Sequence, residues 1–216
     1  MKSNPAKTIA LLLFCLLSIT LLMIRVIYTG QYTFVFLTWN LFLAYIPMGL
    51  STLVYIKRNE ITKTQFWLAS IPWILFFPNA PYILTDLFHL IPRPGISEWF
   101  DLLLILSFAI TGLLFGLLSL RNMHKTVVKF HSALSGYLFA ITSIFMGSFG
   151  VYLGRFERYN SWDILRTPDE LFVDIAQRLI HPMHHPATWG ITLGMGAVIT
   201  LLYVMMGEVE TGDKKR

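Results

Sequence analysis

The sequence predicts an all-α, polytopic membrane helix bundle with about six transmembrane helices. Hydrophobic residues make up 55% of the 216 residues, charged residues only 13%, and the mean hydropathy is +0.61. An average soluble domain has about 45–50% apolar and about 25% charged residues. The apolar residues also form runs long enough to cross a hydrocarbon layer about 30 Å thick. We therefore expect the lipid bilayer to surround most of the chain.

Six apolar segments are expected to form the helices, at about 8–27, 32–56, 65–90, 100–120, 132–154 and 187–207. Each span needs roughly 20 residues, so we expect one integral membrane domain over residues 1–216 and no separate soluble module. The first segment is long and lacks a small-x-small cleavage pair, which favours an uncleaved signal anchor over a signal peptide. Cys15 is the only cysteine, which excludes an intramolecular disulfide.

The distribution of lysine and arginine predicts the orientation of the bundle. Eleven of these residues fall in segments on the side of the N-terminus and six on the opposite side. Because cytoplasmic loops are enriched in Lys and Arg, we expect a multi-pass plasma-membrane protein with both termini in the cytoplasm. The net charge of +5 then reflects topology and contact with anionic lipid headgroups, and we expect no nucleic-acid partner.

The third segment carries the stretch "FPNAPYILTDLFHL", residues 77–90, which predicts a broken helix. Pro78 and Pro81 interrupt the backbone hydrogen bonds, and Asn79 is predicted to cap a new helix that runs through His89. The freed backbone groups must be satisfied by protein or water, so the break should face the bundle or a cavity. A helix N-terminus there would suit an anionic or carbonyl group. The alternative is a proline kink that serves packing alone.

Polar residues near this break are candidates for binding. Asp86 and His89 are three residues apart and share a helix face, where they could transfer a proton or form an ion pair. Two such groups are too few for a metal site, so none is assigned. Asn40, about eight residues into the second segment, is either a ligand-binding residue or a packing contact within the bundle.

The stretch "GRFERYNSWDILRTPDE", residues 154–170, mixes both charge signs with aromatic residues, as is typical of a membrane interface. Its candidate binding residues are Arg155, Glu157, Arg158, Asn160 and Asp163. They form either a collar of mutually paired charges or a polar site that covers the broken helix. Both stretches lie on the same predicted side of the membrane, so we expect Asp86 or His89 to contact this segment. Arg155 is the first choice, because a guanidinium can bind a carboxylate through two hydrogen bonds.

A surface amphipathic helix is expected at about 168–180. Thr167 and Glu170 have the spacing of a capping box, and Pro168 occupies the first helical position. Leu171, Phe172, Ile175 and Leu179 are predicted to share one face, with Arg178 and the acidic residues elsewhere, so the helix could lie flat as a lid. In "HPMHHP", residues 181–186, the prolines argue against the helical spacing that a metal site would use.

Three glycine pairs have the small-xxx-small spacing: Gly112 and Gly116, Gly150 and Gly154, and Gly190 and Gly194. This spacing predicts close helix contacts, within the bundle or with partner helices.

The stretches "PNAPYILTDLFHL" and "GRFERYNSWD" resemble the bacterial integral-membrane family catalogued as domain of unknown function 1361. The resemblance covers nearly the whole span from the second to the sixth segment. The residues at the motif positions are Pro78, Asn79, Pro81, Asp86, His89, Gly154, Arg155, Asn160, Trp162 and Asp163. The family implies a polytopic plasma-membrane protein and supplies no activity, substrate or catalytic residue.

Three functions remain open. The favoured one is binding or transport of a small solute or lipid at an outward-facing polar site, with no cofactor. The second is a membrane enzyme acting on a lipid or envelope precursor, with His89 or Asp86 as general base and Arg155 or Arg158 on the headgroup. The third is a noncatalytic assembly factor that docks through its glycine faces. The sequence has neither an HExxH nor a GxSxG motif, which argues against an enzyme.

Overall fold

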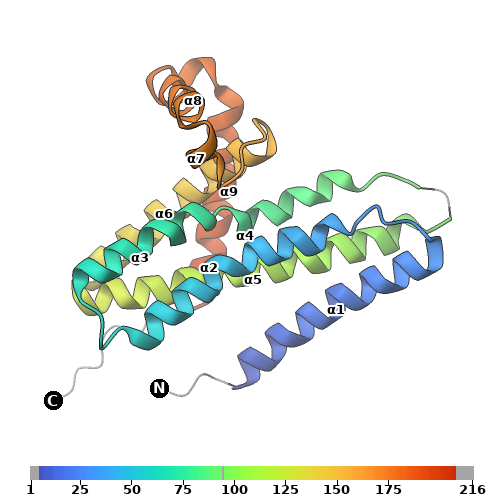
Figure 1. The fold of residues 1–216 in the computed structure, drawn as a ribbon, viewed down its shortest axis with the longest axis horizontal. Helices are drawn as coiled ribbons and strands as arrows, with labels where there is room; N and C mark the ends of the chain where they lie inside the picture. Colours follow the sequence, from blue (N-terminus) through green and yellow to red (C-terminus); the bar gives the residue numbers. More distant parts are fainter. Residues whose placement is uncertain (1–4, 94, 208–216) are drawn as a thin grey trace.

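The structure is a computed structural model that describes residues 5–93 and 95–207. Within these residues every regular element is a helix (Figure 1), which confirms the predicted all-α class. The elements are α1 Pro5–Thr29, α2 Phe36–Lys57, α3 Lys63–Phe76, α4 Asn79–Tyr82, the 3₁₀ helix η1 Ile83–His89, α5 Glu98–Phe130, α6 Ala133–Arg155, α7 Asp163–Arg166, α8 Pro168–Ile180, the 3₁₀ helix η2 Pro182–His184, and α9 Pro186–Met205. Six segments are long and apolar enough to cross a membrane: α1, α2, α3 through η1, α5, α6 and α9. The protein is therefore a multi-pass membrane protein.

Helix α5 lies at the centre of the bundle. In its most apolar stretch of 18 residues 61% are buried, against 22–39% in the other five spans. It packs against α1, α2, α4, η1 and α6. It ends at Phe130, well beyond the predicted end at 120, because Met123 and Val127 continue its buried face among the charged residues that interrupt the apolar run.

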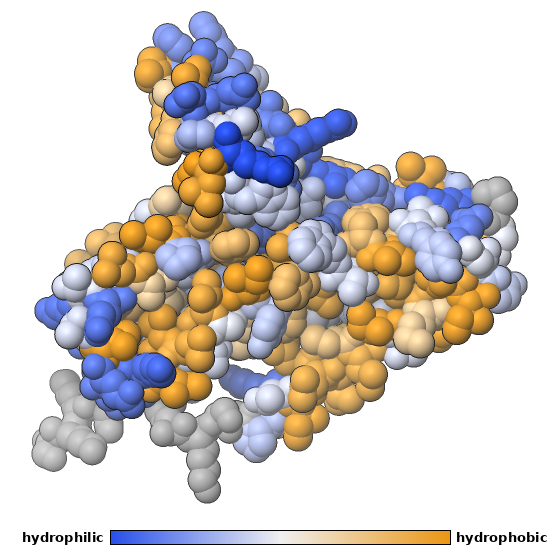
Figure 2. Space-filling model, in the orientation of Figure 1, coloured by the Kyte–Doolittle hydropathy of each residue, from blue (hydrophilic) through white to orange (hydrophobic). Residues whose placement is uncertain are grey.

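Two hydrophobic clusters form the core. One joins α1, α2 and α5 to the α4–η1 segment, with Phe34, Ile83 and Phe108 fully buried. The other joins α3, α5, α6 and α9 around Trp73 and Ile144. Apolar side chains also cover much of the outer surface of the bundle, while hydrophilic residues gather on the protruding part that carries α7 and α8 (Figure 2). Such an apolar exterior suits contact with lipid.

The third span bends at the predicted position but not in the predicted way. Helix α3 begins with a capping box between Thr62 and Gln65 and ends at Phe76. Phe77 and Pro78 keep right-handed helical dihedrals, so the chain continues into α4 without the extended residue that an N-cap needs. The prediction that Asn79 caps a new helix is therefore wrong. From Ile83 the chain tightens into η1, which ends at His89.

Glycines on two helices hold this bent segment. On α5, a Cβ added to Gly112 would lie 2.4 Å from Ile83 Cγ2, and a Cβ added to Gly116 would lie 2.9 Å from Ala80 Cβ. A Cβ on Gly150 of α6 would lie 2.6 Å from Pro78 Cγ. Two of the three predicted glycine pairs thus provide close contacts, and these contacts are with residues 78–83 of the bent segment.

The third glycine pair behaves differently. A Cβ on Gly190 or Gly194 of α9 would meet no atom within 4 Å, so the prediction of close packing inside the bundle is wrong for this pair. Gly196 makes the close contact of α9 instead, with Phe145. A partner helix on the Gly190 face stays a prediction.

Helix α8 begins at Pro168, as predicted, but without the predicted capping box, because the Thr167 side chain caps no backbone N–H. The predicted surface amphipathic helix is confirmed. On its apolar face Leu171 is buried, whereas Phe172 and Leu179 are exposed. The face of α8 that packs on the protein also includes Arg178, which is buried. It forms ion pairs with Glu157 and Asp174.

Candidate functional site

Asp86 is the centre of a buried polar cluster at the end of the third span. Its side chain is 1% exposed. One carboxylate oxygen, Oδ2, accepts a hydrogen bond from Asn40 Nδ2 at 2.8 Å, and Arg155 Nη1 lies 3.6 Å from the other, Oδ1. The predicted contact between Asp86 and Arg155 is confirmed. Three helical segments, α2, η1 and α6, each contribute one member of this cluster.

His89 is the fourth member of the cluster. Arg155 Nη1 lies 3.2 Å from His89 Nε2. A guanidinium can only donate, so Nε2 accepts and the imidazole is neutral, with its proton on Nδ1. In a 3₁₀ helix residues i and i+3 are eclipsed, which explains why Asp86 and His89 reach the same guanidinium.

The carboxylate of Asp86 is only half satisfied. Within the described residues, Oδ1 has no hydrogen-bond partner, and its 3.6 Å separation from Arg155 Nη1 is too long for a hydrogen bond. An unsatisfied buried acceptor costs about 1–3 kcal/mol, or more for a charged group. Arg155 therefore acts on Asp86 mainly as a counter-charge.

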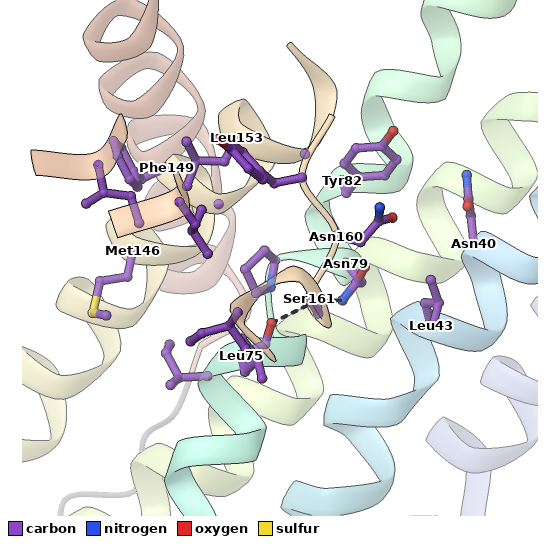
Figure 3. A pocket seen from close by; sticks show the side chains of 18 of the residues that line it. Asn40, Leu43, Leu75, Asn79, Tyr82, Met146, Phe149, Leu153, Asn160 and Ser161 are labelled. Carbon is purple, nitrogen blue, oxygen red and sulfur yellow. Dashed lines mark hydrogen bonds between the residues drawn. The ribbon is translucent and has the colours of Figure 1, made fainter. Parts of the chain in front are cut away.

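A cavity of about 420 Å³ lies beside this cluster (Figure 3). Its wall is mostly apolar and comes from α2, α3, α4, α6, α7, α8 and the loop after α6. Three amide side chains, Asn40, Asn79 and Asn160, line it together with Ser161 and two tyrosines, and none of the described charged side chains does. Because Asn40 both lines the cavity and donates to Asp86, it joins the cavity to the polar cluster.

The loop after α6 is fastened to the bend of the third span. Asn79 Nδ2 donates to the Phe76 carbonyl at 2.9 Å and to Ser161 Oγ at 3.0 Å (Figure 3). Ser161 Oγ in turn donates to the Leu75 carbonyl at 3.1 Å. Two carbonyls at the bend are thus satisfied by protein side chains, as a backbone in a membrane requires.

The family described as protein of unknown function (DUF1361) matches residues 39–202. The chain belongs to this family. Neither the curated proteins nor the solved structures contain a significant match. The matched range of DUF1361 contains all four members of the Asp86 cluster and every residue that lines the cavity.

Three predicted candidates of this DUF1361 protein lie outside both the cluster and the cavity lining. Glu157 pairs with Arg178 at 2.9 Å and accepts from the Tyr152 hydroxyl at 2.9 Å. Arg158 is exposed and adopts a positive φ of 65°, which is uncommon for a non-glycine residue and turns the loop back. Asp163 accepts from the backbone N–H of Asn160 at 2.6 Å. Their contacts shape the loop; a binding role for them stays a prediction.

Sequence reasoning missed a second buried charge cluster. Arg25 of α1 is fully buried and donates to Asp101 of α5 through Nε at 2.8 Å and Nη2 at 3.4 Å. Arg93 Nη1 lies 3.7 Å from the same carboxylate. Phe34 packs under both guanidinium groups, with their Cζ atoms 4.5 and 4.7 Å from its ring centroid. A charged residue near the end of an apolar run needs a partner of opposite charge. The position of Arg25 in the first apolar run is therefore a sequence signal for such a pair.

The histidines of the "HPMHHP" stretch have no metal-binding arrangement. Over residues 5–93 and 95–207, no group of three or more His, Cys, Asp or Glu side chains could hold a metal ion. His185 Nδ1 instead lies 3.0 Å from Arg178 Nη1, so it accepts from a guanidinium as His89 does.

Proposed function

We propose that this DUF1361 protein binds an amphipathic, lipid-like molecule in the cavity beside Asp86, in the outer leaflet of the plasma membrane. The observation that carries the proposal is the composition of the cavity wall: amide groups at the bend and apolar side chains at the rim. Ligand sites of this kind are mostly apolar, with a few placed polar groups that fix the orientation of the ligand.

The rim supports entry from the bilayer. Trp39, Ile71 and Met146 line the cavity, yet 55%, 62% and 54% of their surfaces are exposed. They lie on three helices that are long and apolar enough to cross the membrane. The cavity therefore opens where lipid chains would contact the protein, and an apolar chain could enter sideways.

The uncharged wall indicates the chemistry of the part that is bound there. Asn79 uses both of its N–H donors on Phe76 and Ser161, whereas Asn40 and Asn160 each use one on a carboxylate. The remaining N–H donors and the amide oxygens suit an ester, amide or hydroxyl group. An ionised group in the cavity would lose hydration without meeting a charged partner, which is costly. The ligand segment in the cavity should accordingly be neutral. The alternative of an enzyme is less supported, since neither Asp86 nor His89 lines the cavity.

The distribution of charge supports the outer location. Eleven Lys and Arg residues lie on the side of the termini and six on the side of the loop after α6, which favours cytoplasmic termini.

A matched pair of substitutions tests the proposal. Ile71 and Leu68 lie on α3 with 62% and 61% exposure, but only Ile71 lines the cavity. Binding of the neutral lipid dioctanoylglycerol to the full chain in detergent would be measured by native mass spectrometry. Ile71→Trp should weaken binding and Leu68→Trp should not. Equal binding by the two variants would contradict the proposal.

A further inference from the structure

Four arginines, Arg25, Arg93, Arg155 and Arg178, are buried or mostly buried. They differ in how many of their guanidinium nitrogens donate hydrogen bonds. Arg25 and Arg178 each donate through Nε, Nη1 and Nη2. All three nitrogens of these two guanidinium groups are thus engaged by protein acceptors. Arg93 and Arg155 form a contrasting pair.

Arg93 and Arg155 each make every hydrogen bond, and the shortest contact of each ion pair, through Nη1. The partners of Arg93 are the carbonyls of His89 and Ile91 and the carboxylate of Asp101; those of Arg155 are His89 and Asp86. In the described part of the chain, Nε and Nη2 of both residues have no hydrogen-bond partner. Their side chains keep 20% and 14% exposure, so this open donor edge can be reached.

Both open arginines contact the same residue, His89. Arg93 Nη1 donates to its carbonyl at 3.3 Å, and Arg155 Nη1 to its Nε2 at 3.2 Å. The two guanidinium groups therefore contact one residue, Arg93 at its backbone carbonyl and Arg155 at its ring. An imidazole is either neutral or positive, so His89 cannot balance their charges.

The ion pairs of Asp86 and Asp101 are unequal in charge. Three buried or half-buried arginines, Arg25, Arg93 and Arg155, share these two aspartates, while Arg178 pairs separately with Glu157 and Asp174. One positive charge is left in excess beside the apolar exterior. Phe88, which is 66% exposed, lies under Arg155 with 5.4 Å between Cζ and the ring centroid, so the open edge adjoins a surface suited to lipid.

We propose that Arg93 and Arg155 bind the phosphate ester anion of a ligand, a headgroup phosphate if the ligand is a phospholipid. Guanidinium groups bind phosphate oxygens through paired N–H donors, and a phosphodiester carries the single negative charge that the region lacks. This inference deepens the proposed function, on which it rests for the neutral part of the lipid that the cavity would hold. Asn40, which lines the cavity and donates to Asp86, connects the two places.

The test uses the full chain in detergent, with three probes titrated by calorimetry. Dioctanoyl phosphatidylglycerol carries both chains and phosphate, glycerophosphoglycerol carries the phosphate alone, and dioctanoylglycerol carries the chains alone. The variants are Arg93→Gln and Arg155→Lys, the latter keeping a positive charge beside Asp86 so that folding is preserved. Arg166→Gln, at an exposed arginine, is the control.

Both phosphate probes should bind at least roughly tenfold more weakly to Arg93→Gln and Arg155→Lys, and unchanged to Arg166→Gln. Tighter binding of the phospholipid than of glycerophosphoglycerol identifies a lipid as the source of the phosphate. Equal binding identifies a soluble phosphate ester and still supports the anion site. Affinities within twofold of wild type in both arginine variants would overturn it.

Ile71→Trp separates this inference from the proposed function. If it weakens both lipids while the arginine variants change nothing, the cavity binds lipid and the anion site is wrong. If the arginine variants weaken phosphate binding and Ile71→Trp affects neither lipid, the anion site stands and the cavity proposal fails.

Discussion

Arg25 and Asp101 form an ion pair in which the arginine is fully buried, with 2.8 Å between Nε and Oδ1. The pair fastens α1 to α5, and a hydrogen bond of 3.2 Å between Ser18 and Thr111 does the same further along the helices. The pairing is asymmetric, because Asp101 has a second cation in Arg93 at 3.7 Å, whereas Asp101 is the only acidic partner of Arg25 in the described part of the chain.

This asymmetry predicts unequal losses of stability. Asp101→Leu should lower the free energy of unfolding by about 3–5 kcal/mol, because it strands a buried guanidinium. Arg25→Met should cost less, since Asp101 keeps Arg93. The double variant should recover most of the loss, as apolar replacement of a buried pair often does. Thermal unfolding in detergent measures all three, with Glu98→Ala, at an exposed residue of α5, as control. Equal losses for the two single variants would contradict this account.

The hydrogen bonds of Ser161 predict that it holds the loop after α6 in place. Ser161→Ala leaves the Leu75 carbonyl without its donor and should cost about 1–3 kcal/mol. The loop should also become more sensitive to protease. Ser97→Ala is the matched control, because Ser97 is exposed and its side chain makes no capping hydrogen bond. Unchanged protease sensitivity at the loop would show that other contacts hold it.

Glycine substitutions should separate crowded from open helix faces. Gly150→Ala places a Cβ 2.6 Å from the rigid Pro78 ring, and such overpacking costs about 1–3 kcal/mol. Gly194→Ala meets no atom within 4 Å and should stabilise α9 by up to about 1 kcal/mol. Unfolding midpoints of the two variants in one detergent give the comparison. If both variants shift the midpoint in the same direction, the contact with Pro78 does not limit the size of residue 150.

The orientation can be checked by cysteine labelling in a Cys15→Ser background. Met183 is 90% exposed in η2 before α9, and Glu60 is exposed in the turn between α2 and α3. A membrane-impermeant maleimide should label Met183→Cys in intact cells and Glu60→Cys only after permeabilisation. Labelling of Glu60→Cys in intact cells would reverse the proposed sidedness of the cavity.

The sequence alone predicts the membrane-spanning helices and one side-chain contact between them. Apolar run length predicted six spans, since hydrocarbon thickness sets the length that a span requires. The contact between Asp86 and Arg155 could be predicted because both stretches fall on one side of the membrane and a buried carboxylate needs a counter-charge.

What the sequence could not predict depends on three-dimensional packing. The apolar run predicts a helix end at 120, because Arg121 and Lys125 interrupt it, but α5 continues to Phe130 because residues between and after these two stay buried. The Arg25–Asp101 pair joins two segments whose proximity no local pattern indicates. The cavity is formed by residues from six helices and one loop, so its existence depends on how the glycines of α5 and α6 position the bend.

The 33 residues of α5 also bear on how the protein sits in membranes of different thickness. At about 1.5 Å per residue this helix is roughly 50 Å long, and even a tilt of about 40° leaves a projection of nearly 40 Å against a hydrocarbon layer of about 30 Å. Helix α9, with 20 residues, just reaches across. A thicker bilayer would therefore draw more of α5 into the hydrocarbon without stretching it, whereas α9 has no such reserve. Hydrophobic mismatch should thus act first on α9 and on the loop and α8 attached to its start.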